Sequence, residues 1–174
     1  YQNLESRSLE LISATENFCS DLSALNLDSL KNSYQQSMLA WQAIQHIQFG
    51  PITYFNWNYR MHYWPDERGA SGRQLDALIA SQDESVLTSN AFPRQSVGVQ
   101  GLPSLEKLLY DANALSDFRD NAYLCSLTTS ISRNINEISF GVTQRWMDEY
   151  RALILDPVAG GFYENAEDLS IDFL

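Results

Sequence analysis

Side chains that could bind a ligand or take part in chemistry gather in two stretches of this sequence. The first, "FGPITYFNWNYRMHYWPDERGASGRQL" at residues 49–75, holds two of the four Trp and one of the two His. The second, "GLPSLEKLL" at residues 101–109, places a carboxylate three residues after a proline. Aromatic walls with a few convergent polar groups suit a small-molecule site. The predicted lining of such a site is Arg60, His62, Trp64, Asp66, Arg73, Gln100 and Glu106.

Several of these residues have an equally good structural interpretation. Arg60 and Asp66 lie among aromatic residues, where burial would demand a charged partner. They either meet a ligand or form an ion pair with each other. The aromatic residues Trp57, Tyr63 and Trp64 are expected in the core or at a domain interface, because an exposed apolar patch of that size is unusual on a monomer.

Pro103 in the second stretch allows two local structures. Inside a continuous helix its ring would clash with the carbonyl of Val99 and kink the helix. At the first turn of a new helix its missing N–H costs nothing, and Glu106 then lies in the favourable N-terminal region of the helix dipole. The second structure is favoured.

The usual catalytic motifs are missing from the sequence. It contains no HExxH, GxSxG, P-loop or GxGxxG pattern. With only His46 and His62, a multi-histidine metal site is impossible, although a site that mixes histidine with carboxylates remains conceivable. The motifs therefore indicate no enzyme class.

Charge narrows the choice of partners. The chain carries 22 acidic and 11 basic residues, a net charge of −11. This balance argues against nucleic acid, which needs a basic face, and against an anionic membrane surface as a direct partner. Five of the bases cluster in the middle third, either as ordinary surface pairs, which we favour, or around a less negative cleft: Arg60, Arg68, Arg73, Arg94 and Lys107.

Helical periodicity dominates the elements that must position these residues. Apolar residues mark one helix face over 11–25 and another over 30–47, with Asp28 as the expected N-cap of the second and Gly50-Pro51 as its end. A loop is expected at 69–72, short helices at 72–81 and from Asp83, and a helix over 94–111 interrupted at Gly101 and Pro103. A final helix of roughly 35 residues, roughly 50 Å long, is expected to stop at Asp156-Pro157. We see no alternating strand, so the sequence predicts an all-α, antiparallel up-and-down helical bundle. From the residues alone, Cys19 and Cys125 are either buried thiols or one long-range disulfide.

Three stretches together resemble the imelysin-like family: "AWQAIQHIQFGPI", "YWPDERGASGRQLDALI" and "VGVQGLPSLEKLLYD". The resemblance runs from about residue 4 to 174 and is strongest to the lipoprotein branch, which carries WPD and GLPxLE motifs. Members are bacterial periplasmic proteins, some of them called insulin-cleaving or iron-regulated. The resemblance implies a duplicated helical fold of two bundle-like halves with a functional site between them. It makes residues 1–160 the N-terminal half and 161–174 the start of the second, with Asn165–Leu174 opening a further helix.

The resemblance also bears on chemistry. The family's GxHxxE signature, proposed as part of a metal site, aligns with Gly101–Glu106, so Glu106 is a candidate ligand for a divalent metal or iron. The histidine position holds Pro103, whose side chain has no donor for a metal. Export to an oxidising compartment raises the Cys19–Cys125 disulfide to equal standing with two free thiols.

Three functions follow from the residues and the resemblance. The preferred one is a non-enzymatic periplasmic protein that binds a small ligand or metal in connection with iron or haem uptake. The alternative is a structural or interaction module of the cell envelope. The third, an imelysin-type metallopeptidase, is disfavoured because of Pro103. The expected partners are the missing C-terminal half and a small ligand or iron species. No nucleic acid is expected, and membrane attachment is expected only through an N-terminal lipid anchor outside this sequence.

Overall fold

The computed structural model describes residues 1–156, 161, 163–165 and 167–168. Those residues form helices and turns, with no strand among them, which confirms the predicted all-α fold. The helices run in this order: α1 Gln2–Ser20, α2 Ala24–Gln42, η1 Gly50–Asn56, α3 Trp57–Met61, α4 Ala70–Ser81, η2 Glu84–Leu87, η3 Phe92–Arg94, η4 Val97–Val99, α5 Leu102–Leu109, α6 Ala114–Asp120, α7 Tyr123–Arg145, the π-helical η5 Trp146–Tyr150 and α8 Arg151–Leu155.

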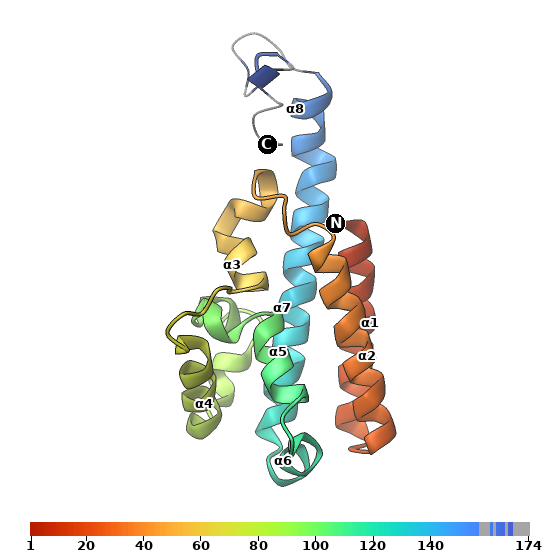
Figure 1. The fold of residues 1–174 in the computed structure, drawn as a ribbon, viewed down its shortest axis with the longest axis vertical. Coiled ribbons are helices and arrows are strands. Elements are labelled where there is room, and N and C mark those ends of the chain that lie inside the picture. Colours follow the sequence, from red (N-terminus) through yellow and green to blue (C-terminus); the bar gives the residue numbers. More distant parts are fainter. Residues whose placement is uncertain (157–160, 162, 166, 169–174) are drawn as a thin grey trace.

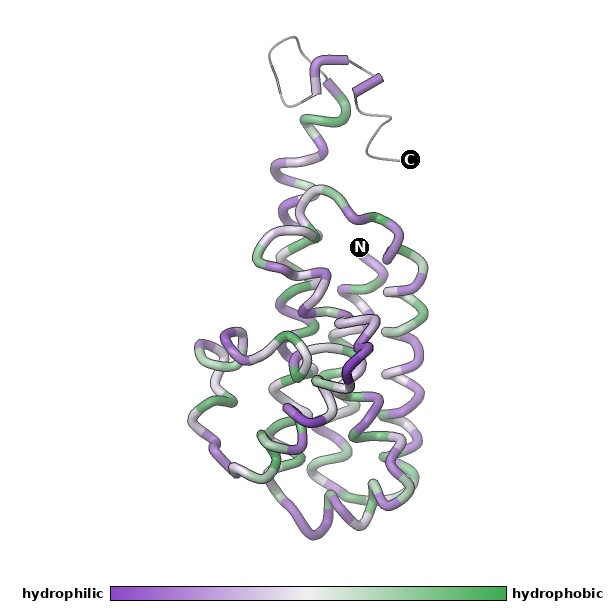
Figure 2. Tube along the Cα trace, turned by 60° about the vertical axis from the view of Figure 1, so that its left-hand side comes forward, coloured by the Kyte–Doolittle hydropathy of each residue, from purple (hydrophilic) through white to green (hydrophobic). Residues whose placement is uncertain are grey.

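Three long helices form the bundle. Figure 1 shows α1, α2 and α7 along the long axis of the molecule, and α1 packs against both of the others. The chain descends in α1, returns in α2 and ascends again in α7, so α1 is antiparallel to its two neighbours. Figure 2 shows hydrophobic residues recurring along these helices, and their fully buried members include Leu4, Leu11, Phe18, Leu30, Leu127, Ile131, Ile135 and Val142.

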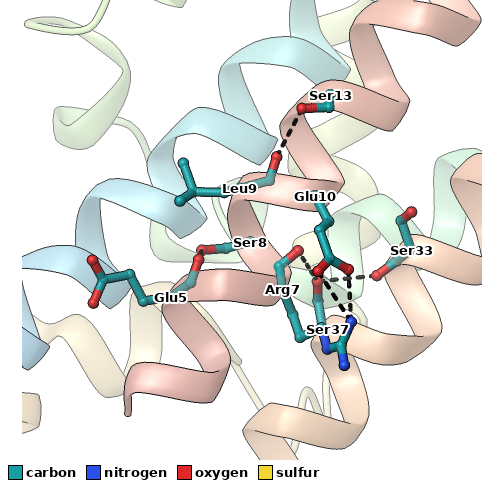
Figure 3. Close-up of polar contacts among 8 residues, drawn as sticks. All are labelled: Glu5, Arg7, Ser8, Leu9, Glu10, Ser13, Ser33 and Ser37. Carbon is teal, nitrogen blue, oxygen red and sulfur yellow. Dashed lines mark hydrogen bonds and ion pairs between the residues drawn. The ribbon is translucent and has the colours of Figure 1, made fainter.

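Small polar side chains fill part of the same interior. Thr15 and Ser132 share a buried hydrogen bond, Oγ1 to Oγ 3.0 Å, between α1 and α7. The hydroxyl of Ser37 donates to the Ser33 carbonyl at 3.0 Å and to the Arg7 carbonyl at 3.2 Å, which ties α2 to α1 (Figure 3). These hydroxyls let the helices approach closely while keeping their hydrogen bonds.

A disulfide joins the lower end of α1 to the first turn of α7. The Sγ atoms of Cys19 and Cys125 lie 2.22 Å apart and their Cα atoms 5.6 Å apart. Beside it, the rings of Phe18 and Phe118 meet edge to face at 5.0 Å, so α6 covers this end of the bundle. The sequence pattern did not predict α6.

Helix boundaries differ from the prediction at the start of the chain. The apolar face expected over residues 11–25 spans two helices, because α1 ends at Ser20 and α2 begins at Ala24. The cap of α2 is Ser23, whose hydroxyl accepts from the Asn26 N–H at 3.3 Å. Asp28 is therefore inside α2 and the prediction for it was wrong. The same helix ends at Gln42, well before Gly50-Pro51.

The helix boundaries predicted after residue 94 were confirmed only in part. Helical structure continues from α7 through η5 to Leu155, close to the predicted stop. The helix expected over 94–111 is two short turns followed by α5. The proposed domain boundary at 160 and the helix expected at 165–174 fall largely outside the described residues. None of the described helices is long and apolar enough to cross a membrane.

Candidate functional site

The start of α5 is fixed against the end of α3. A Cβ atom at Gly101 would lie 2.3 Å from the Met61 carbonyl oxygen and 2.5 Å from that of Arg60. Only glycine allows this backbone approach, because real side-chain carbons do not come so close. Pro103 is the second residue of α5, where no helical N–H is needed. This confirms the favoured interpretation of "GLPSLEKLL", and the alternative, a continuous helix kinked by Pro103, is wrong.

Asp66 of the WPD motif holds the start of α4. Its carboxylate accepts from the backbone N–H groups of Ala70 and Ser71, both at 2.8 Å. Burial by itself would raise the pKa of Asp66, but these hydrogen bonds outweigh it and hold the pKa below its usual value. Because this cap starts the helix at Ala70, the loop predicted for residues 69–72 was wrong beyond Gly69.

Arg60 lies in a network of neutral amides. Its Nε donates to the Gln100 side-chain oxygen and its Nη2 to that of Asn134, both at 2.8 Å. Asn134 Nδ2 donates in turn to the Gln100 carbonyl at 3.2 Å. Burial lowers the pKa of Arg60, and Glu137 partly offsets this effect. The network locks α3, the turn before α5, and α7 together.

The ion pair considered between Arg60 and Asp66 is therefore wrong, since each side chain has other partners. Asn134 was missed by sequence reasoning. Its signal was a polar residue on the buried stripe of α7, 2% exposed between Ile131 and Ile135. Arg73 lies outside the Arg60 network, with its Nη1 donating to the Arg68 carbonyl at 2.7 Å, and its charge helps to hold the pKa of Asp66 low.

Three predicted site residues do come together. A groove of about 720 Å³ opens between α2 and α5, and its lining is Tyr34, Gln35, Met38, Leu39, Gln42, His62, Trp64, Glu106 and Tyr110. His62, Trp64 and Glu106 belong to the predicted set, whereas Arg60, Asp66, Arg73 and Gln100 are not among the lining residues. Trp64 was expected in the core or at a domain interface. The core position was wrong, because this side chain is 71% exposed.

The α2 wall of this groove, hereafter the α2–α5 groove, was missed. Tyr34 and Met38 were interpreted as part of an apolar core face, and Tyr34 is indeed buried at 4% exposure. Nothing in a helical period distinguishes a core face from the edge of a groove, since both recur every three or four residues. Gln35 and Gln42, polar positions two turns apart on one edge of that face, were the available signal.

Electrostatics in the α2–α5 groove centre on one carboxylate. Tyr34 Oη donates to Glu106 Oε2 across 3.4 Å. Burial and the neighbouring Glu106 together raise the pKa of the Tyr34 phenol. Burial lowers the pKa of His62 below its ordinary value, although Glu106 works in the opposite direction. The groove therefore presents a neutral histidine, a neutral phenol and one carboxylate at pH 7.

The described residues do not supply a three-ligand metal centre. Within the part of the chain that the structure describes, no three side chains of His, Cys, Asp or Glu gather where they could hold a metal ion. Catalytic zinc sites ordinarily take three protein ligands. A zinc centre of that kind does not fit the residues around Glu106.

The fold and groove together define a class: a helical-bundle protein with a groove of ligand-binding size. The sequence matches the family model described as Imelysin over residues 1–170, and the chain belongs to this family. The structure is similar to that of an imelysin-like protein from Psychrobacter arcticum 273-4, with a TM-score of 0.80 and 24% sequence identity. The match covers 99% of this chain and 52% of that protein, so this chain spans about half its length. No curated protein matches the sequence.

Proposed function

We propose that this chain is a non-catalytic, ligand-binding unit of an imelysin-like protein, and that its ligand lies in the α2–α5 groove. The observation that carries the proposal is the meeting of His62, Trp64 and Glu106 in one groove from separate parts of the sequence. A volume of about 720 Å³ is within the range of small-molecule sites. The connection to iron or haem uptake rests on the family resemblance.

The groove has the surface that ligand binding needs. Three of its side chains keep much of their area open, with Trp64 71%, Leu39 58% and Tyr110 44% exposed. Contact with a ligand would remove this apolar area from water, which stabilises a complex by about 25 cal/mol per Å². The amides of Gln35 and Gln42 supply polar contacts that would fix its orientation.

The family's name includes a peptidase classification, which we do not extend to this chain. Pro103 stands where the proposed metal signature has histidine, and the described residues hold no three-ligand cluster. These features support binding over hydrolysis.

We place the protein in the periplasm, attached to the envelope by a lipid outside this sequence. The Cys19–Cys125 disulfide supports an oxidising compartment, because disulfides rarely persist in the reducing cytosol. We also propose that a second bundle-like half, corresponding to the rest of the Psychrobacter protein, is this chain's partner. Exposed aromatic residues outside the groove, Phe55 at 66% and Phe140 at 52%, support such an interface.

Calorimetric titration of the full chain with ferric citrate and with haemin tests the binding proposal. Both Trp64→Ala and Glu106→Gln should weaken binding by about tenfold or more, because each removes a groove contact worth about 1.4 kcal/mol. Phe55→Ala is the matched control, an exposed aromatic residue outside the groove, and should leave affinity unchanged. Cleavage of insulin B chain that requires Zn²⁺ or Fe²⁺ and disappears in Glu106→Gln would instead establish a peptidase.

A further inference from the structure

The charge of Glu106 is not compensated within the described chain. Its carboxylate has one hydrogen bond, the long 3.4 Å contact from Tyr34, and none of the ion pairs among the described residues includes it. The adjacent cation is engaged elsewhere, because Lys107 Nζ lies 2.6 Å from Asp76 and 3.2 Å from the Gly72 carbonyl. An incoming cation would therefore meet an available carboxylate.

No other lining residue of the α2–α5 groove is charged at pH 7. The remaining members are aromatic, aliphatic, amide or thioether side chains, together with His62. Burial lowers the pKa of His62, so the imidazole stays neutral. Among the lining residues the formal charge is that of Glu106, while the ammonium group of Lys31 lies at the Tyr110 end of the groove. A positive ligand is therefore complementary to the groove at Glu106.

The rings in the groove favour a cation as well. Aromatic faces carry negative potential and attract ammonium groups within about 6 Å of the ring centroid. Lys31 already uses this property, since its Nζ lies 5.3 Å from the centre of the Tyr110 ring. The same end of α5 thus binds an ammonium group in the folded chain, and Tyr34 and Trp64 add two further rings to the groove.

We propose that the ligand of the α2–α5 groove is a small organic ammonium ion, with its charged head beside Glu106 and its apolar body on Trp64 and Leu39. This inference rests on the proposed function and names its ligand class. An organic cation gains both from the carboxylate and from the apolar surface, whereas a simple inorganic cation gains only from the carboxylate. The exposed area of Trp64 and Leu39 is what an apolar body would cover.

A second pocket could compete for the same ligand. A pocket of about 350 Å³ beside α5 is lined by residues that include Leu75, Leu124, Asp76, Asp117 and Asp120, together with the basic residue Lys107. It lacks aromatic residues, so it offers a cation no ring contact. The experiment must separate the two pockets.

The test is calorimetric titration of the full chain with 2-phenylethylammonium and with 2-phenylethanol, which replaces the ammonium by a neutral hydroxyl. We expect the charged compound to bind about tenfold more tightly, from an ion pair and a ring contact acting together. Glu106→Gln should remove the part of this preference that the ion pair supplies and leave only the weaker ring contact. Asp117→Asn, which removes one carboxylate from the competing pocket, should preserve it.

Each of the other outcomes would overturn a different part of the proposal: the site, the ligand class or the binding function. A preference lost in Asp117→Asn and kept in Glu106→Gln would overturn the groove as the cation site. Equal binding of both compounds, still weakened by Trp64→Ala, would overturn the ligand class while the binding function stands. If neither compound binds but ferric citrate or haemin does, the ligand class is again wrong while the binding function stands. Failure of all four ligands to bind would overturn both proposals.

Discussion

The two sides of this molecule are built in different ways. The α1–α2–α7 bundle buries long apolar stripes, so that Leu30 and Leu127 are 0% exposed. The side formed by residues 50–110 consists of short helices and turns, and there Trp64 is 71% exposed. Repeated apolar contacts specify the bundle, whereas the other side combines fully buried residues such as Met61 and Leu102 with single backbone-level contacts. These contacts fix the positions of its short helices, so that Trp64 can stay open beside them.

The largest effect should come from the crosslink of the bundle. The disulfide joins residues separated by 106 positions, and closing a loop of that length lowers the entropy of the unfolded chain. The double variant Cys19→Ala/Cys125→Ala should lose about 4 kcal/mol of unfolding free energy in urea titrations. Dithiothreitol should destabilise the natural protein by a similar amount and leave the double variant unchanged. Insensitivity of the natural protein to the reductant would show that the bond does not form.

A glycine on the groove side should give the next largest effect. In Gly101→Ala the new Cβ meets backbone oxygens that cannot move aside, and we expect a loss of about 3 kcal/mol. Gly72→Ala is the matched control inside α4, where the nearest atom is the flexible Lys107 Nζ at 3.4 Å. It should gain about 0.5 kcal/mol from better helix propensity. Equal responses of the two variants in urea titration would contradict the role of the close approach at Gly101.

The same contrast explains what the sequence predicts. The course of α7 follows from period alone, because Leu127, Ile131 and Ile135 repeat on one face and all are buried. The helical period of the apolar residues does not locate the point where one helix ends and an antiparallel one begins. The chain turns between Ser20 and Ala24 while apolar residues continue on both sides, and this is why the sequence pattern predicted Asp28 as the cap and missed Ser23.

On the side formed by residues 50–110, the sequence predicted which residues matter better than it predicted what they do. Asp66 and Arg60 were singled out as charges among aromatic residues, but their partners are backbone N–H groups and neutral amides. These partners lie on other elements, so no local pattern identifies them. Glu106 and His62 were found because a carboxylate near a helix start and a histidine among aromatic residues are locally unusual.

A third test concerns the Arg60 network. Arg60→Met keeps most of the apolar stem but removes both donors, leaving oxygens of Gln100 and Asn134 unsatisfied. Gln100 is 0% and Asn134 2% exposed, so we expect a loss of about 2 kcal/mol in chemical denaturation. Arg68→Met, at an exposed position, is the control and should change stability by less than about 0.5 kcal/mol. If both variants behave alike, the network does not hold this side together.

The smallest effect should appear as a pH dependence of the groove side. Burial lowers the pKa of His62 in the folded protein, whereas the unfolded chain keeps the ordinary value of about 6.5. Below that pH the unfolded chain binds a proton at His62 that the folded chain does not bind. The free energy of unfolding therefore decreases as the pH is lowered, until the folded histidine is also protonated. His62→Gln should therefore flatten the fall in melting temperature between pH 7.0 and 5.5. His46→Gln is the control, because that residue is exposed just after α2, and it should keep the fall. A fall that persists in full in His62→Gln would show that other groups cause the pH dependence and that burial does not lower the pKa of this imidazole.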